Sequence, residues 1–252
     1  MSCWRLTNIV LPEGLTTIGS EAFAYCESLL SVTIPNTVTS IGYGCFRECN
    51  NLIEVVFTPD SQINKIPSYA FEYCENLVNI DIPNTVTEIE ANAFSNCVKL
   101  KNVSLPNTLT TLSDYSFLNC LSLEKINLPN SITTISSFTF SGCTSIMEIS
   151  LPPKLSYVRY YIFSGCSSLK TIFISSNVWG IGMGAFSGCT SMETIVIDKS
   201  VTNIAYNAFY NCTSLINVYY TGSETDWNRI GIADGNQLLI NATIHYNHVP
   251  EE

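Results

Sequence analysis

The sequence predicts a β-rich, α/β-type solenoid with a parallel sheet on one face, short irregular or helical turns opposite, and a C-terminal cap. Two observations predict it. Phenylalanine is followed three residues later by cysteine nine times, from Phe23/Cys26 to Phe209/Cys212, at steps of 23 residues except one of 25. Within each step, apolar and polar residues alternate. This period is typical of stacked repeats, because so short a unit buries its apolar face only against neighbours.

The first predicted element of each unit is a strand. Six and eight residues after each cysteine stand apolar residues, such as Val32 and Ile34, with polar residues before and between them. This alternation indicates a half-buried strand. A proline such as Pro35 usually follows and ends the strand, because proline has no N–H to donate. We expect the strands of successive units to lie parallel, about 4.8 Å apart.

The rest of the unit predicts a second inward-facing segment and a compact arc. Aliphatic residues stand twelve and fifteen residues after the cysteine, as Val38 and Ile41 do. The phenylalanine and cysteine then point into the same interior from an arc that a single helical turn could form. The two extra residues of the longer step lie within Thr58–Gln62. They should enlarge one turn and leave the apolar register intact.

The stretch from Leu29 to Cys49 reads L-x-x-V-x-I-P-x-x-V-x-x-I-G-x-x-C-F-x-x-C and resembles the BspA-like class of leucine-rich repeats. Cys45 stands where alanine is usual, and the resemblance covers residues 3 to about 246. It implies a right-handed leucine-rich-repeat superhelix and a non-enzymatic protein-binding or adhesion module, extracellular or at the cell surface. An intracellular protein-interaction scaffold is the alternative. No catalytic residues come with this repeat.

We predict a solenoid of about ten units over residues 3–220 and a capping segment over 221–252. Trp227 and Ile230 should cover the last repeat, and residues 242–246 should add a final strand. The alternative for this aromatic, acidic tail is a binding module. At the other end the chain enters the repeat in mid-unit without a targeting signal, so we expect it to be part of a longer protein. Trp4 should cover part of the open end.

Composition bears on the partners. The chain is 46% hydrophobic and 13% charged, with 11 basic and 21 acidic residues and a net charge of −10. An acidic chain argues against nucleic acid, since phosphate binding needs clustered Lys and Arg. It also argues against adsorption to anionic membranes. The charge-free stretches 171–192 and 200–223 are interrupted by polar residues and predict no membrane insertion. A protein partner is expected, and a carbohydrate partner is possible.

The eleven cysteines are interpreted as buried free thiols that act as small apolar fillers. Their number is odd, and side chains in a ladder run parallel, which disfavours disulfides. Cys45 lies outside the regular column, so we expect it to be the most reactive thiol. Zinc needs four nitrogen or sulfur ligands at set spacings, and both histidines lie in the tail, so neither a metal nor a cofactor is expected. No catalytic motif is present.

Two groups of residues break the repeat and are the candidate partner-binding residues. On the outer face of the sheet, three successive units carry Phe173, Val196 and Tyr219. Exposed apolar residues in a row can mark an interaction site, although they could also tuck under the cap. The second group lies on the opposite flank and could bind protein or carbohydrate, or pack between neighbouring loops. It consists of Tyr157, Tyr160, Tyr161, Trp179 and Tyr206.

Overall fold

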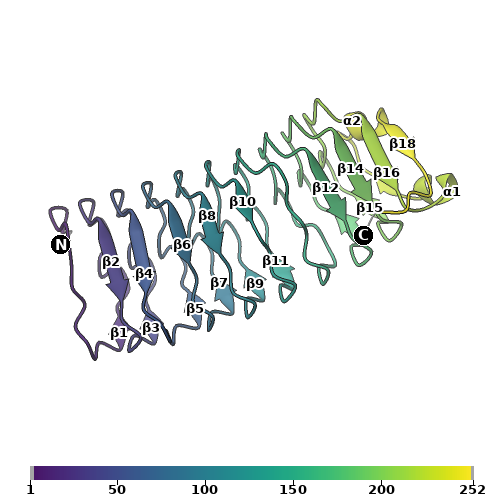
Figure 1. Ribbon diagram of the computed structural model, residues 1–252. Helices are drawn as coiled ribbons and strands as arrows, with labels where there is room; N and C mark the ends of the chain where they lie inside the picture. Colours follow the sequence, from purple (N-terminus) through teal and green to yellow (C-terminus); the bar gives the residue numbers. More distant parts are fainter. Residues whose placement is uncertain (1–2, 251–252) are drawn as a thin grey trace.

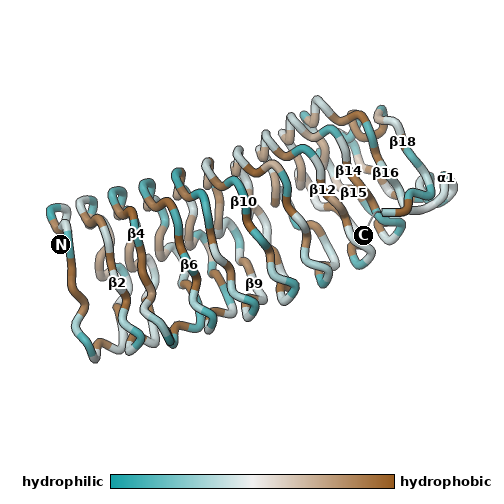
Figure 2. Tube along the Cα trace, in the orientation of Figure 1, coloured by the Kyte–Doolittle hydropathy of each residue, from teal (hydrophilic) through white to brown (hydrophobic). Residues whose placement is uncertain are grey.

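A computed structural model describes residues 3–250. The chain winds as an elongated coil with one turn per repeat and its two termini at opposite ends (Figure 1). Hydrophobic residues recur at the same places in successive turns (Figure 2). The predicted solenoid is therefore confirmed. Residues 1–2 and 251–252 lie outside the described part, and the latter two belong to the predicted capping segment.

The long face of the coil is a parallel sheet formed by the predicted strands, and it consists of two parts. Neighbouring strands pair at equivalent positions of successive repeats, as Val32 does with Val55. The first part contains β2 (Ser31–Ile34), β4 (Glu54–Phe57), β6 (Asn79–Asp81), β8 (Asn102–Ser104) and β10 (Lys125–Ile126). The second part contains β12 (Thr171–Ile174), β14 (Thr194–Ile197), β16 (Asn217–Tyr220) and β18 (Thr243–His245).

The predicted second segment forms a further set of parallel ladders, which sequence reasoning did not anticipate. Its strands are two residues long, and each except the last, β17, buries one aliphatic side chain such as Ile41 or Ile89. The first ladder joins β1 (Thr17–Ile18) to β3 (Ser40–Ile41). The second ladder joins β5 (Lys65–Ile66), β7 (Glu88–Ile89), β9 (Thr111–Leu112) and β11 (Thr134–Ile135). The third ladder joins β13 (Gly180–Ile181), β15 (Asn203–Ile204) and β17 (Gly231–Ile232).

The arc that carries phenylalanine and cysteine is a chain of tight turns and contains no helix in any repeat described. Alternate N–H groups along the arc donate to the next repeat. Phe46 N, for example, donates to Ala70 O at 2.9 Å, and Phe71 N donates to Ala93 O at 2.8 Å. The intervening N–H groups close turns within the repeat. The arc is thus a third hydrogen-bonded ladder between successive repeats.

The side chains of the arc form two columns inside the solenoid. Each phenylalanine ring stacks on the next, with centroids 5.3 to 5.8 Å apart. Each thiol from Cys49 to Cys212 donates to the carbonyl of the phenylalanine in the preceding repeat, at 3.1 to 3.2 Å. The thiols therefore do more than fill space, because each gives a second hydrogen bond to a carbonyl that already accepts one from the backbone N–H of the cysteine three residues on.

Ten of the eleven cysteines are buried, and Cys3 is the exposed one. Cys45 has no exposed surface, and burial raises the pKa of its thiol far above the ordinary value. Burial likewise raises the pKa of Cys49 and of Cys212 to about 12. A thiol that stays protonated is a poor nucleophile. The expectation that Cys45 is the most reactive thiol is therefore wrong, since the core encloses this position as it encloses the regular column.

The C-terminal segment extends the solenoid before closing it. It contains α1 (Glu224–Trp227) and α2 (Gln237–Ile240), and its strands β17 and β18 continue both ladders by pairing with β15 and β16. Trp227 and Ile230 are buried, and the Trp227 ring meets Tyr220 edge-on at 5.2 Å. The predicted contacts and final strand are confirmed. Trp4 was expected to cover the N-terminal end, but it is 53% exposed and lies against Arg5.

One buried amide joins the C-terminal segment to the last arc. The side chain of Asn236, 1% exposed, accepts a hydrogen bond from Phe209 N at 3.0 Å. It donates to Ala205 O at 2.9 Å and to Ala233 O at 2.8 Å. Asn236 therefore takes the place that the backbone of a further repeat would occupy. Sequence reasoning missed this residue, because nothing in the repeat pattern marks it.

The strand ladders are interrupted at two repeat junctions. At the first junction, β4 and β6 pair only through Glu54 and Asn79, although the short strands β5 and β7 of the same two repeats remain paired. One repeat earlier, β3 and β5 do not pair, although β2 and β4 do. At the second junction, residues 148–158 do not pair with β10 or β11 of the preceding repeat. They form two isolated bridges to the following repeat. The phenylalanine stack and the arc hydrogen bonds continue through both. The long sheet is therefore looser than the arc at both junctions, and at the first junction the short ladder of β5 and β7 also stays closed.

We predict that Asn236→Ala destabilises the C-terminal end by about 2–4 kcal/mol, because it leaves Phe209 N–H buried without a partner, removes one of the two hydrogen bonds to Ala205 O, and leaves a cavity at a fully enclosed position. Urea unfolding followed by circular dichroism measures the loss. Asn241→Ala is the control, since Asn241 is exposed. Equal effects of the two substitutions would refute the role assigned to Asn236.

We also predict that a thiol reagent labels one cysteine rapidly in the folded protein, namely Cys3, and all eleven in urea without reductant. The difference follows from the burial of the other ten thiols. Mass spectrometry of the labelled peptides identifies the sites. Rapid labelling of Cys45 under native conditions, or two or fewer labels in urea, would contradict the structure.

Candidate interaction surfaces

The Phe173 row, formed by Phe173, Val196 and Tyr219, lies in register across three neighbouring strands. Phe173 on β12 pairs with Val196 on β14, and Val196 pairs with Tyr219 on β16. All three side chains point to the outer face, opposite the buried isoleucines and valine that precede them. Phe173 is 42% exposed, and the other two are half-buried.

The C-terminal segment covers one end of the row. The ring of Tyr219 stacks on His245 with centroids 4.5 Å apart and lies 4.8 Å from that of His248. His245 is itself fixed by a hydrogen bond between Nε2 and Asn217 Oδ1 at 2.9 Å. The expectation that the row tucks under the C-terminal segment therefore holds for Tyr219 and not for Phe173. The accessible part of the row is Phe173 with the edge of Val196.

A hollow of about 440 Å³ adjoins this accessible part. It lies at the second junction, where residues 148–150 follow β10 without a recorded pair. Phe173 and Val196 form its apolar side, and Lys125 and Glu148 contribute one charge of each sign. A concave surface with an exposed aromatic residue and few charges is suited to receive an apolar side chain from another protein.

The aromatic flank, defined as Tyr157, Tyr160, Tyr161, Trp179 and Tyr206, forms a cluster in part. The ring of Tyr157 contacts that of Trp179, with centroids 4.6 Å apart, and meets Tyr160 edge-on at 6.3 Å. Burial raises the pKa of the Tyr157 hydroxyl, and Tyr160 adds to the shift. Tyr161 belongs to a separate stack with Phe138 and Tyr115. Tyr206 has no recorded contact with another aromatic ring of the described chain.

Glycines of the next repeat make room for two of these tyrosines. A Cβ atom on Gly180 would lie 2.9 Å from Cε2 of Tyr157, and one on Gly184 would overlap the ring of Tyr161. The φ of Gly184 is also positive, at 60°. Tyr157 and Tyr161 thus pack between neighbouring turns, as one of the two interpretations of this group expected. The accessible rings of the flank are Tyr160, Trp179 and Tyr206, which are 47%, 52% and 57% exposed.

Sequence reasoning missed one member of this surface. Met183 is 39% exposed and occupies the repeat position of Tyr160 and Tyr206, in the turn between them. Its position could have been found by comparing equivalent residues across repeats. The accessible flank therefore runs over three successive turns.

Residues 3–250 contain no group of three or more His, Cys, Asp or Glu side chains placed to hold a metal ion. None of the helices in that range is long and apolar enough to cross a membrane.

Comparison with known proteins identifies the family. A family model for the BspA type leucine rich repeat region, matched in six copies, covers residues 1–124 and 110–230. The chain belongs to the BspA-type leucine-rich repeat family. The resemblance carried by the repeat pattern is thereby confirmed. Leucine-rich repeat proteins of this kind generally are protein-interaction modules, and their solenoid is typically a binding scaffold without enzymatic activity.

Solved structures of bacterial leucine-rich repeat proteins are similar to this BspA-type chain. One from Bacteroides ovatus is 26% identical with a TM-score of 0.66, over 92% of this chain and 66% of that one. The T. pallidum leucine rich repeat protein is 26% identical with a TM-score of 0.52, over 72% and 74%. The pneumococcal vaccine antigen PcpA, at 17% identity and a TM-score of 0.53 over 93% and 72%, shows the fold alone. No curated protein sequence matched.

This chain spans just under two thirds of the Bacteroides ovatus protein, at 66% of its length.

We predict that Gly184→Ala destabilises this BspA-type solenoid by about 2–3 kcal/mol, because the added methyl group meets Tyr161 at a positive φ. Gly165→Ala is the matched control. Gly165 also has a positive φ, of 74°, but a Cβ there would make only an ordinary contact, 3.7 Å from Gly142. Gly165→Ala should lower the free energy of unfolding by about 1 kcal/mol, which is the cost of placing a side chain at a positive φ without a steric clash. Equal losses in urea unfolding would show that Tyr161 is not packed on the glycine.

Proposed function

We propose that the chain is a non-enzymatic module that binds an extracellular or cell-surface protein through the outer face of its sheet, around Phe173. The observation that carries the proposal is the pairing of a 42% exposed phenylalanine with a hollow of about 440 Å³ on that face. An aromatic residue at the edge of a concavity is typical of an energetically dominant contact in protein interfaces. Val196 extends the apolar surface.

The surroundings support a protein partner of mixed character. Thr171, Thr194 and Asn217 flank the Phe173 row and offer hydrogen-bonding groups. Lys125 and Glu148 at the far side of the hollow could form rim contacts with either sign of charge. An apolar centre with a polar rim is the usual anatomy of a protein interface.

Family membership supports an extracellular or surface location within a longer protein, since the similar solved structures are bacterial leucine-rich repeat proteins. An intracellular interaction scaffold is the second possibility, and the free thiols favour it. Fractionation of the source cells with an antibody to the chain distinguishes the two. Signal confined to the cytosol would overturn the extracellular part of the proposal and leave the binding surface untouched.

The second candidate function is carbohydrate binding by Tyr160, Trp179 and Tyr206, which are exposed, and of which Trp179 and Tyr206 lie in the charge-free stretches. Exposed aromatic rings there could stack on sugar faces. Binding of the chain to an array of neutral glycans, lost in Trp179→Ala, would establish this function. Binding to proteins alone would exclude it.

The main test uses Phe173→Ser on an array of immobilised extracellular proteins. We expect binding of the unaltered chain to at least one protein, and at least about tenfold weaker binding of the variant, because a central aromatic contact is lost. Unfolding by urea should change little, since the side chain is partly exposed. Leu121→Ser is the matched control, because Leu121 is also 42% exposed.

Equal binding by the unaltered chain and Phe173→Ser would refute the proposal. Equal weakening by Phe173→Ser and Leu121→Ser would show that the loss reflects general surface hydrophobicity. If Phe173→Ser unfolds the chain, Phe173→Tyr, which keeps the ring, should retain stability and most of the binding.

A further inference from the structure

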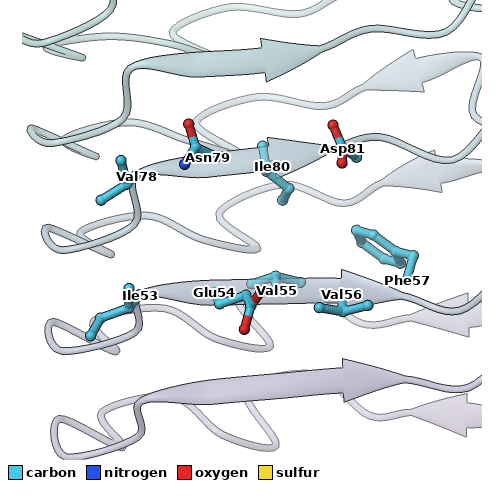
Figure 3. Close-up of a pocket in the computed structure, with 9 residues that line it drawn as sticks. All are labelled: Ile53, Glu54, Val55, Val56, Phe57, Val78, Asn79, Ile80 and Asp81. Atoms are coloured by element: carbon cyan, nitrogen blue, oxygen red, sulfur yellow. The ribbon is translucent and has the colours of Figure 1, made fainter.

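The first junction contains an open groove that the Phe173 surface does not involve. The groove lies between β4 and β6, where the 25-residue step replaces the usual 23. Four residue pairs join β2 to β4 and three join β6 to β8, but one pair joins β4 to β6. Figure 3 shows β4 and β6 farther apart than β6 is from the next strand, with the ring of Phe57 over the space.

Two adjoining hollows make up this groove. One, of about 440 Å³, lies over Val56 and Ile80, and the other, of about 470 Å³, extends along Thr58–Gln62. Phe57 and Asp81 line both, so the hollows are continuous along the direction of the strands. The groove therefore runs along the strand direction, as an extended polypeptide bound beside β4 would.

The walls leave hydrogen-bonding groups without partners. Because the pairing stops at Glu54 and Asn79, the ladder provides no partner on β6 for the backbone of Phe57, which alternates with the residues that bond to β2. The hydroxyl oxygen of Thr58, where the insertion begins, is buried and has no hydrogen-bond partner among the described residues. Unpaired strand edges are the groups to which an added peptide strand bonds.

The charged residues that line the groove indicate which kind of ligand it would bind. Glu54, Asp60 and Asp81 line the groove, all three are exposed, and none forms an ion pair with a described residue. No lysine or arginine lines either hollow. The floor and edges are apolar, with Val56 39% and Ile53 52% exposed. A metal ion does not fit, because no group of three potential ligands is close enough within the described chain.

We propose that this groove binds an extended segment of a partner protein in which lysine or arginine alternates with aliphatic residues. The segment lies beside β4, with its cations on the outer face toward Glu54 and Asp81 and its aliphatic side chains on the other face toward Phe57. Alternation fits because successive side chains of an extended chain point to opposite sides. This site is independent of the Phe173 surface, since the two lie at different junctions.

The test measures fluorescence anisotropy of a labelled peptide of alternating lysine and valine. We expect saturable binding that added salt weakens, and no binding of the matching glutamate–valine peptide. The double variant E54Q/D81N should bind the lysine peptide at least about tenfold more weakly. E27Q/E75Q is the matched control. It removes the same charge from exposed carboxylates outside the groove and should bind like the unaltered chain.

A second variant tests the shape of the groove. Replacing Thr58–Gln62 by Pro-Asn-Thr, the sequence at Pro35–Thr37 and Pro83–Thr85, restores the 23-residue step. It should close the groove, abolish binding and raise the urea midpoint. Absence of saturable binding by the unaltered chain, or equal weakening by E54Q/D81N and E27Q/E75Q, would overturn the proposal. If the shortened loop does not fold, the charge variants decide alone, because their side chains are exposed.

Discussion

The structure depends on the arc ladder, in which each repeat is fastened to the next by backbone hydrogen bonds, a stacked phenylalanine and a thiol bonded to a carbonyl. A buried phenylalanine contributes about 1.5–3 kcal/mol through burial, and stacking adds about 0.5–1.5 kcal/mol. The thiol also gives its own donor a partner and adds a second hydrogen bond to a carbonyl that already accepts one within its turn. Because the unit recurs at every turn, its contribution is repeated along the whole solenoid.

The two interrupted junctions show how much of the assembly the arc can support. One repeat before the first junction, where β3 and β5 do not pair, the arc carries additional contacts on its outer side, since Arg47 Nε lies 2.7 Å from Glu72 Oε2 and Tyr43 contacts Tyr69. Burial raises the pKa of the Glu72 carboxyl, and Arg47 opposes the shift. The strand ladders can therefore open locally without breaking the core. That freedom creates the hollows on the sheet face, and both proposed protein-binding sites lie beside one.

The stacking of successive turns also buries some aromatic residues of the surface and leaves others exposed to a partner. Tyr157 and Tyr161 fill space above glycines, and Tyr219 lies against two histidines of the C-terminal segment. Phe173, Trp179 and Tyr206 keep large exposed surfaces. Burial by a neighbouring turn, rather than residue type, decides which of them a partner could reach.

The sequence by itself determined the repeat, the strand positions, the apolar core and the alignment of Phe173 with Val196 and Tyr219. Each of these follows from spacing along the chain, because a fixed period places equivalent residues side by side. Only the tertiary structure decided the enclosure of Cys45, the bonds from thiol to carbonyl, the role of Asn236 and the opening between β4 and β6. These features depend on contacts between neighbouring turns and on small changes in backbone separation. A repeat pattern aligns such residues but does not show which atoms meet.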